Sequence, residues 1–421
     1  MVKITFIGAA GRVNTTAVAN FTRFEESKGL DMALYDIDQP GMLETIEIVK
    51  KGMNLTGNKF SLFPEKTMED ALNGADIILF CAKAKPTKHP PFNLSDDLGN
   101  VELMQEIIKI AEKTAINNYR VINFANPTDK LAIMVKTLNP EINITALCTG
   151  PEEFKRTIMM YYKIPLEEEH RVDIDWVGCN HYGLIPGLRI DGKDIIEDLK
   201  ESYDFDWRNF KGLRYGDGYD LATNLSLLHA TGILTAPLGH VEKWHNGVPK
   251  AVGGGRYRPT KNILLMMSTS DEDDATDELY WELMDSWGTR QVAMATLGIL
   301  GRSNKEFFMQ APNNGYLEKY NDNIFIETPG TFKNGEFKRK QFEISDYVQN
   351  IIGNEALRRY MMSKSIAEQD YAALIRAMML HGSSVPIPVA RKIIGEKWGL
   401  EENLEDLYVI PDKDQYKKFP I

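Results

Sequence analysis

Residues 2–14 read VKITFIGAAGRVN, a short apolar run that ends in a glycine turn and continues into a helical pattern. Gly8 would let the chain turn sharply, and Gly11 would let backbone N–H groups approach an anion. The helix that begins at Arg12 and Val13 would point its positive end at that anion. The segment therefore predicts a strand, a turn and a helix arranged to bind the pyrophosphate of a dinucleotide.

An acidic residue ends the next apolar run, MALYDID at residues 32–38. Asp36 follows the glycine turn at close to the spacing of about 20 residues at which an acid hydrogen-bonds the ribose hydroxyls. A carboxylate there would repel a 2′-phosphate, so we expect NAD rather than NADP. Asn14 stands where a third glycine is usual, and the prediction therefore also depends on the pattern of the surrounding chain.

Apolar runs and helical patterns alternate through the N-terminal part of the chain, with strands expected at residues 76–82, 120–127 and 143–150 and helices at residues 12–29, 67–75 and 98–118. Continuous Ile, Val and Leu runs separated by helices indicate a parallel sheet covered on both faces. We predict an α/β fold in which residues 1–180 form a Rossmann-type, doubly wound parallel sheet that binds NAD. Residues 181–421 are predicted as a mixed α/β domain for catalysis and oligomerisation, with a hairpin at 187–195, strands within 315–332 and helical patterns at 221–234 and 274–301.

The composition limits the partners and the compartment. The net charge of −11 argues against nucleic acid or an anionic membrane as a partner. No apolar run approaches the roughly 20 residues that cross a bilayer, and the first residues show no signal-peptide pattern. Three cysteines suggest no disulfide framework. We predict a cytoplasmic homodimer or homotetramer that acts on a small molecule.

Three later strand ends carry polar side chains or a thiol. Asn126 lies in the segment NPTD, Cys148 in LCTGP, and Asn180 and His181 in GCNH. Doubly wound sheets bind ligands outside the carboxyl ends of their strands, so we expect these residues to line the site. His181 could transfer a proton, bind a metal or pack as a buried ring, and Asn126 could equally belong to a turn.

The segment at residues 74–107 and the NPTD sequence resemble the lactate and malate dehydrogenase superfamily. In those enzymes a histidine at a strand end is the acid and base, and His181 falls at that place. The dehydrogenases also carry arginines in the loop after the strand that ends near Cys81, where they grip substrate carboxylates. Here that loop has no arginine, and a lysine does not replace a bidentate guanidinium; its cationic residues are Lys83, Lys85, Lys88 and His89.

The chain resembles the related glycoside hydrolase family 4 more closely. Members of that family have a cysteine at one strand end and an Asn-His pair at a later one, as at Cys148 and at Asn180 and His181. They also share a C-terminal segment whose outline is followed by residues 313–329, NNGYLEKYNDNIFIETP. The resemblance implies a glycosidase that depends on NAD and on Mn2+ or another divalent metal, and that acts on a small-molecule glycoside.

The resemblance assigns Cys148 and His181 as the metal ligands. A thiolate and an imidazole suit a transition metal, and two ligands leave positions open for the vicinal oxygens of a sugar. Asn126 is expected to contact the cofactor and, with Asn180, to take part in the catalytic site. Cys179 points to the opposite face from Asn180 on a regular strand and is predicted to pack in the core.

The mechanism implied by the resemblance oxidises carbon 3 of the sugar with NAD+, removes the proton on carbon 2, eliminates the glycosidic bond and adds water. The family's segment that carries an acid before a Val-Glu pair appears here only as LGHVEKW at residues 238–244. The catalytic base is therefore open: Tyr219 is the nominal candidate, and Tyr215 and Asp217 are the alternatives.

Two other functions remain open at this point. A dehydrogenase of a hydroxy acid or sugar acid would use His181 as a proton relay and release NADH as a product. A redox-sensing protein would bind NAD without turnover and would need neither Cys148 nor His181. Accumulation of NADH would identify the first, and NAD binding without any reaction would identify the second.

Overall fold

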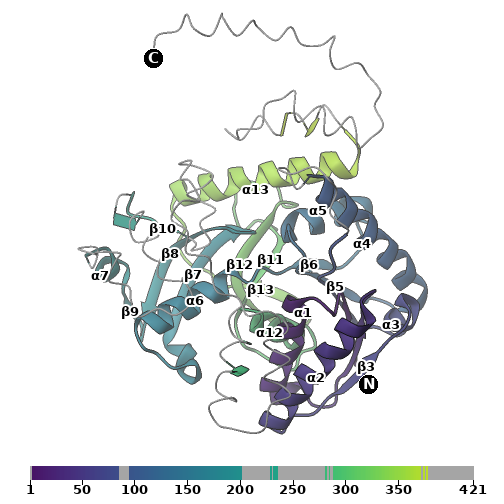
Figure 1. The fold of residues 1–421 in the computed structure, drawn as a ribbon. Helices are drawn as coiled ribbons and strands as arrows, with labels where there is room; N and C mark the ends of the chain where they lie inside the picture. The colour runs from purple at the N-terminus through teal and green to yellow at the C-terminus, as the bar shows by residue number, and fades with distance from the viewer. Residues whose placement is uncertain are drawn as a thin grey trace, which may run out of the picture.

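The computed structural model describes residues 2–84, 94–201, 228–229, 231–235, 280–281, 284, 288–370, 373–374 and 376–377 (Figure 1). These residues form one mixed β-sheet with helices packed against both of its faces. Within them, no helix is both long enough and apolar enough to cross a membrane.

The N-terminal half of the sheet is parallel, in the order β3-β2-β1-β4-β5-β6. Its strands are β1 (Lys3–Ile7), β2 (Asp31–Tyr35), β3 (Ser61–Pro64), β4 (Ile77–Phe80), β5 (Arg120–Asn123) and β6 (Ile144–Ala146). The winding reverses between β1 and β4, and doubly wound sheets bind nucleotides at such a switch point. The predicted Rossmann-type α/β fold and the strands expected in this half are confirmed.

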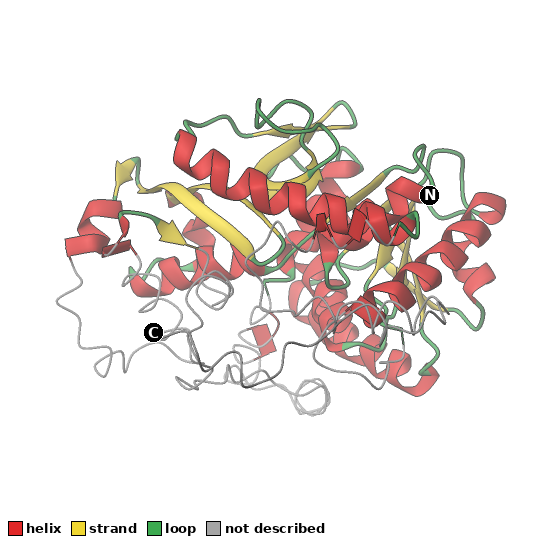
Figure 2. Cartoon of the chain, turned by 90° about the horizontal axis from the view of Figure 1, so that it is seen from above, coloured by secondary structure: helices red, strands yellow, loops and turns green. Residues whose placement is uncertain are grey.

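Helices cover both faces of the parallel half. One face packs against α1 (Arg12–Asn20), α2 (Gln39–Thr56) and α12 (Arg290–Ile299). The other packs against α3 (Met68–Leu72), α4 (Leu94–Thr114) and α5 (Thr128–Leu138). The long α13 (Asp346–Ala367) lies against α5 and extends over the remaining strands, and it crosses in front of them when the molecule is seen from above (Figure 2).

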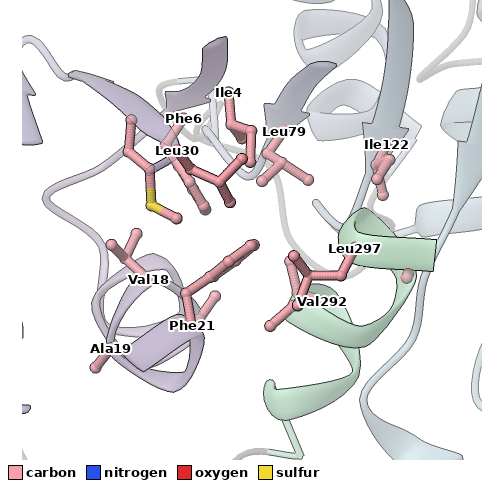
Figure 3. Packing of buried hydrophobic residues seen from close by; sticks show 14 of the residues in the cluster. Ile4, Phe6, Val18, Ala19, Phe21, Leu30, Leu79, Ile122, Val292 and Leu297 are labelled. Carbon is pink, nitrogen blue, oxygen red and sulfur yellow. The ribbon is translucent and has the colours of Figure 1, made fainter. Parts of the chain in front are cut away.

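The core under α1 joins residues that are far apart in the sequence. Phe21 packs edge-on against Phe6 of β1, with ring centroids 5.9 Å apart. Val292 and Leu297 of α12 point into the same space from the other side (Figure 3). A helix from the C-terminal half of the chain therefore completes the core of the nucleotide-binding half.

The helix predicted at residues 12–29 is too long. The α-helix ends at Asn20, and the chain continues in two short 3-10 turns, Phe21–Arg23 and Glu25–Ser27. Phe24 between them is extended, with φ −112° and ψ 115°. The side-chain amide of Asn58 donates hydrogen bonds to the carbonyls of Thr22, at 3.2 Å, and of Phe24. This remote amide satisfies carbonyls that a continuous helix would use internally, which periodicity alone does not reveal.

The other half of the sheet is antiparallel and continues from β6 in the order β11-β12-β7-β8-β10. Its strands are β7 (Val172–Cys179), β8 (Tyr182–Ile190), β9 (Lys193–Asp194), β10 (Leu234–Thr235), β11 (Phe307–Pro312), β12 (Phe325–Lys333) and β13 (Glu336–Arg339). The hairpin predicted at 187–195 is confirmed as β8 and β9, and the strand expected within 315–332 begins at Phe325. Two further helices, α6 (Gly150–Tyr161) and α7 (Ile196–Glu201), and a 3-10 helix at Leu166–Arg171 flank these strands.

Residue 180, the predicted domain boundary, lies in the turn that joins β7 to β8. Strands from both sides of this residue pair in the same sheet. The division into two domains stays a prediction. The helical pattern expected at 274–301 contains α12, whereas most of the pattern at 221–234 lies outside the described residues.

Candidate functional site

The glycine turn after β1 has the geometry that the sequence predicted. Gly8 has a φ of +90°, and a Cβ atom there would lie 2.7 Å from the Cα and N atoms of Ala82. Gly11 precedes α1, and a Cβ atom on it would meet only the Gly8 carbonyl, at 3.4 Å. The N-cap residue of this helix is Gly11 itself, which has no side chain to cap it. Its first N–H groups, at Arg12 and Val13, are therefore suited to meet an anion.

Asn14, which replaces the third glycine, stabilises this turn. Its side chain is fully buried, and Nδ2 donates hydrogen bonds to the carbonyls of Gly8, at 2.5 Å, and of Ile7, at 3.4 Å. Asn14 in place of a third glycine therefore stabilises the turn, and its side chain is buried beneath it.

Asp36 lies immediately after β2, beside the glycine turn. Its Oδ2 accepts a hydrogen bond from the N–H of Ala10, and its Oδ1 accepts one from the N–H of Asp38, both at 2.9 Å. A carboxylate has about four lone-pair sites, so both oxygens can still accept a ribose hydroxyl. The structure therefore brings Asp36 and the two turn glycines together, as predicted, and shows that Asp36 also holds the turn.

Asn126 and Asn180 contact each other although they follow strands in different halves of the sheet. The Nδ2 of Asn180 donates to the Oδ1 of Asn126 at 3.1 Å. The Nδ2 of Asn100 in α4 donates to the backbone carbonyl of Asn126 at 3.4 Å. The Oδ1 of Asn180 is buried and has no hydrogen-bond partner among the described residues. This carbonyl oxygen is available to a hydroxyl or to a metal.

Asn180 and His181 form the two-residue turn between β7 and β8. His181 has a φ of +60°, which is uncommon for a residue with a side chain. The N–H of Asn180 donates to Asp129 Oδ2 at 3.1 Å, and the same oxygen lies 2.8 Å from Nη1 of Arg359 in α13. Asp129 and Arg359 are 1% and 4% exposed. A buried ion pair therefore anchors the turn that carries His181.

Cys148 lies between β6 and α6 with its thiol buried. Its Sγ accepts a hydrogen bond from the N–H of Gly150 at 3.4 Å, and the backbone N–H of His181 also points to it. Burial raises the pKa of Cys148 well above its usual value, and the carboxyl group of Glu327 raises it further, while the two N–H groups lower it. Without a metal this group is a thiol, so a metal that binds here has to displace its proton.

Glu327 of β12 lies fully buried close to the Cys148 thiol. Its Oε2 accepts from Nε1 of Trp176 at 3.0 Å, and its Oε1 accepts from Nε2 of Gln310 at 2.8 Å. Burial raises the pKa of Glu327 to about 8. Gln310 pairs with Ala146 of β6, and Glu327 pairs with a residue of β7. The Gln310–Glu327 pair therefore ties the Cys148 strand to the strand that leads into His181.

The donor set suits a transition metal with open positions. Cys148 would supply a thiolate and His181, whose backbone N–H meets that thiol, an imidazole, while the unpartnered Oδ1 of the neighbouring Asn180 could add an oxygen. Across the part of the chain that the structure describes, no three His, Cys, Asp or Glu side chains form a group that could hold a metal. Cys179 is fully buried among apolar residues, in agreement with its predicted packing role, and all three cysteines are free.

Some predicted residues cannot be placed. Tyr219, Tyr215 and Asp217, the candidates for the base, lie outside the described residues, as do three cations of the loop after Cys81, Lys85, Lys88 and His89. Lys83 is described and exposed.

Sequence reasoning overlooked two residues of the site, Asp129 and Arg359. Asp129 is the last residue of the quoted segment NPTD, so its position three residues after Asn126 was a usable signal. Arg359 had none, because it lies on α13 and meets Asp129 only in the folded protein.

The fold and the site define an α/β protein that has a dinucleotide-binding type of glycine turn and, at other strand ends of the same sheet, a buried thiol against a histidine turn. Residues 176–383 match the model of the family 4 glycosyl hydrolase C-terminal domain.

The chain is also similar to individual glucosidases. The chain is 22% identical over 220 residues to the 6-phospho-beta-glucosidase BglT of Thermotoga maritima, and this match spans 48% of the chain and 51%, about half, of that relative. The structure of a 6-phospho-alpha-glucosidase from gut microorganisms, in complex with NAD and glucose 6-phosphate, superposes with a TM-score of 0.72 at 16% identity over 96% of this chain and 98% of that one. The structure of a Thermotoga maritima 6-phospho-beta-glucosidase with manganese, NAD+ and glucose 6-phosphate superposes with a TM-score of 0.67. The two chains are 16% identical, and the match covers 95% of this chain and 98% of that one.

Proposed function

We propose that the chain is an NAD- and divalent-metal-dependent glycosidase. The observation that carries this proposal is the meeting of Cys148 with the Asn180–His181 turn in the same sheet as an intact nucleotide turn. An NAD-binding protein without turnover has no use for a buried thiol that faces the backbone of a strained histidine. The match of residues 176–383 to the family 4 glycosyl hydrolase model and the similarity to glucosidases support the same proposal.

The residues that would hold the cofactors are those that the sequence indicated. The turn from Gly8 to Gly11 and the first N–H groups of α1 would hold the pyrophosphate, Asp36 the ribose hydroxyls, and Cys148 and His181 the metal. When bound, NAD+ supplies reversible hydride removal at carbon 3, and the metal supplies a Lewis acid for the sugar oxygens.

The protein's own residues orient the sugar and move the proton. The free Oδ1 of Asn180 accepts a sugar hydroxyl, while its amide stays on Asn126. The Asp129–Arg359 pair keeps the turn of Asn180 in place. The proton on carbon 2 goes to a base, for which Tyr219 is our proposal and Tyr215 and Asp217 the alternatives.

The substrate class follows from the relatives. The matched glucosidases are named for 6-phosphoglucosides, and two of the superposed structures hold glucose 6-phosphate. We therefore place glycosides of phosphorylated hexoses first among the substrates of this chain. A homodimer or homotetramer and a cytoplasmic location stay predictions.

The decisive experiment follows carbon 2 in heavy water. Aryl 6-phosphoglycosides are incubated with the protein, NAD+ and Mn2+ in D2O, and the released sugar is examined by NMR while NADH is followed at its absorbance. The proposal expects deuterium at carbon 2 and no net NADH. A product without deuterium, together with NADH formed in proportion to it, would establish the dehydrogenase instead.

Metal content tests the ligands separately. Cys148→Ser and His181→Ala should lose bound Mn2+ in elemental analysis and lose activity. Cys81→Ser is the matched control, because Cys81 follows β4 and its thiol only approaches the carbonyl of Phe124, at 3.7 Å. If the first two variants keep a full complement of metal, Cys148 and His181 are not its ligands.

A further inference from the structure

A polar cavity lies at the amino ends of two parallel strands, away from the strand end that carries Cys148. It has a volume of about 860 Å3 and is bounded by the amino ends of β5 and β6, by the loop after β11 and by the β12–β13 hairpin. Asn143 lines it just before β6, whereas Cys148 lies just beyond the other end of that strand. At about 3.3 Å per residue these two positions are on the order of 16 Å apart. The cavity is therefore separate from the site described above.

Two arginines line this cavity, and neither has a carboxylate partner among the described residues. The guanidinium of Arg120 donates from Nη2 to the carbonyl of Gly335 at 2.7 Å. That of Arg339 donates from Nη2 to the carbonyls of Ala311 and Pro312, both at 2.8 Å. The Nε of Arg339 is buried and unpartnered within the described chain. Each guanidinium thus uses one nitrogen for the protein and keeps N–H donors for a ligand.

Three other arginines of this protein are paired with acids. Arg290 pairs with Glu152 at 2.7 Å, Arg189 with Asp175 at 2.5 Å, and Arg359 with Asp129. In contrast, burial lowers the pKa of Arg339 to about 10 and also lowers the pKa of Arg120. Both guanidiniums are therefore partly removed from water, and no carboxylate of the described residues forms an ion pair with either of them.

The wall between the two arginines is aromatic. The rings of Phe332 and Phe337 are 5.8 Å apart, and the guanidinium carbons of Arg120 and Arg339 lie 5.7 and 5.8 Å from the Phe332 and Phe337 ring centroids, respectively. The lining has three other charged residues. Lys338 and Glu336 form an ion pair with each other, so Glu318 is the remaining carboxylate in a lining with two guanidiniums.

We propose that this cavity binds a phosphate-bearing small molecule, with its phosphate on Arg120, its ring against Phe332 and Phe337, and a further polar group towards Arg339. A phosphate monoester carries a charge near −2 and three acceptor oxygens, so a forked guanidinium can bind two of these oxygens at once. The volume admits a sugar phosphate or a nucleoside monophosphate. The assignment is independent of the proposed glycosidase activity, because the cavity shares no residue with the Cys148 site.

The test measures phosphate binding to the full chain by calorimetry, with NAD+ at saturation to occupy the nucleotide turn. Inorganic phosphate is the first probe, and glucose 6-phosphate and AMP then separate the two sources. We expect saturable binding of inorganic phosphate that Arg120→Gln weakens about tenfold, the effect of losing a hydrogen bond to a charged group. Binding should also weaken as NaCl is raised.

Arg302→Gln is the matched control. Arg302 also donates to backbone carbonyls, those of Glu26 and Lys28, but lies outside the cavity, so this variant should bind phosphate like the native protein. Arg339→Lys serves as the second variant, because a lysine keeps a donor for the carbonyls of Ala311 and Pro312. It should weaken the binding of glucose 6-phosphate and AMP more than that of inorganic phosphate, because only the larger ligands extend to residue 339 and a lysine lacks the fork.

Three outcomes would overturn the proposal. The first is that the native chain shows no saturable phosphate binding. The second is that the native chain and Arg120→Gln bind phosphate equally well. The third is that self-association of the chain depends on Arg120 whereas phosphate binding does not. The last result would make the cavity a contact between copies of the chain.

Discussion

The parallel and antiparallel halves of the sheet differ in what they bury. In β1 and β4 every buried side chain is apolar except Thr5. In β7 and β12 the chain buries Asp175 and Glu327, and the helices packed nearby bury further ions, namely Glu152, Arg290, Glu355, Arg358 and Arg359. The nucleotide turn of the parallel half depends on two glycines, whereas the Asn180–His181 turn of the antiparallel half is anchored by a buried ion pair.

This difference follows from how each turn is held. The nucleotide turn is closed by local contacts to β2 and α1, namely those of Asp36 and Asn14. The Asn180–His181 turn is anchored from α13, through Arg359 and Asp129. A buried ion pair fixes such a remote turn in one position, but it destabilises the fold strongly if one partner is lost.

The largest effect is expected from Arg359→Met, which leaves Asp129 and Glu355 buried without their shared cation. Removing one partner of a buried ion pair costs about 3–5 kcal/mol. Urea unfolding followed by circular dichroism should therefore show a large drop in the midpoint.

The matched control is Arg171→Met, whose partners Glu168 and Asp191 are exposed, so its midpoint should stay close to that of the native protein. Equal shifts in the two variants would contradict the contrast between the halves.

The next largest effect is the pH dependence of the free energy of unfolding that Glu327 causes. Its pKa is about 8 in the folded protein because of burial, against about 4.3 for an exposed glutamate. The folded state therefore holds a proton that the unfolded chain releases, and stability falls as the pH rises from about 4.3 towards 8. The slope from this group is about 1.4 kcal/mol per pH unit.

Glu327→Gln isolates that contribution. The amide keeps an acceptor for Trp176 and a partner for Gln310 but cannot ionise. Unfolding free energies of the native and variant proteins between pH 5 and pH 8 should diverge, with the native protein losing more. Parallel curves would show that Glu327 is ionised in the fold at neutral pH.

The nucleotide half should respond more moderately. Gly8→Ala places a side chain at φ +90°, with its Cβ 2.7 Å from the backbone of Ala82, a strain of about 1–3 kcal/mol. Both NAD+ affinity and stability should drop, as measured by fluorescence titration and thermal unfolding. Gly11→Ala, with φ −69° and only the Gly8 carbonyl within reach of its Cβ, at 3.4 Å, should lower NAD+ affinity alone. An unaltered NAD+ affinity in both variants would exclude this turn as the pyrophosphate site.

The smallest effect concerns cofactor choice. Asp36→Ala should weaken NAD+ binding about tenfold, the value of one hydrogen bond to a charged group. NADP+ binding should weaken less, because the repulsion of its 2′-phosphate disappears at the same time. Affinities from titrations with both cofactors test this, and an equal loss for both would mean that Asp36 acts only through the N–H of Ala10.

The sequence predicts the parallel half well because its signals are local. Gly8, Gly11 and Asp36 lie within one βαβ unit, and continuous apolar runs mark the strands there. Prediction failed where a distant side chain decides the conformation, as Asn58 does when it ends the helix after Asn20.

The site was only partly predictable for the same reason. Cys148 and the Asn180–His181 pair are visible as strand ends, and the structure places the His181 backbone against the Cys148 thiol. Glu327 was visible in its segment, yet its burial beside Cys148 depends on β12 lying between strands that come much earlier in the chain.

The position of the β11–β12 hairpin also governs the order of assembly during translation. This hairpin lies between β6 and β7, although its residues leave the ribosome long after both strands. Until residue 333 has been synthesised, the nascent chain presents one unpaired edge on β6 and another on β7. Its vulnerability to aggregation while it is being made is therefore concentrated at these two edges, and it ends when the late hairpin closes the gap between them.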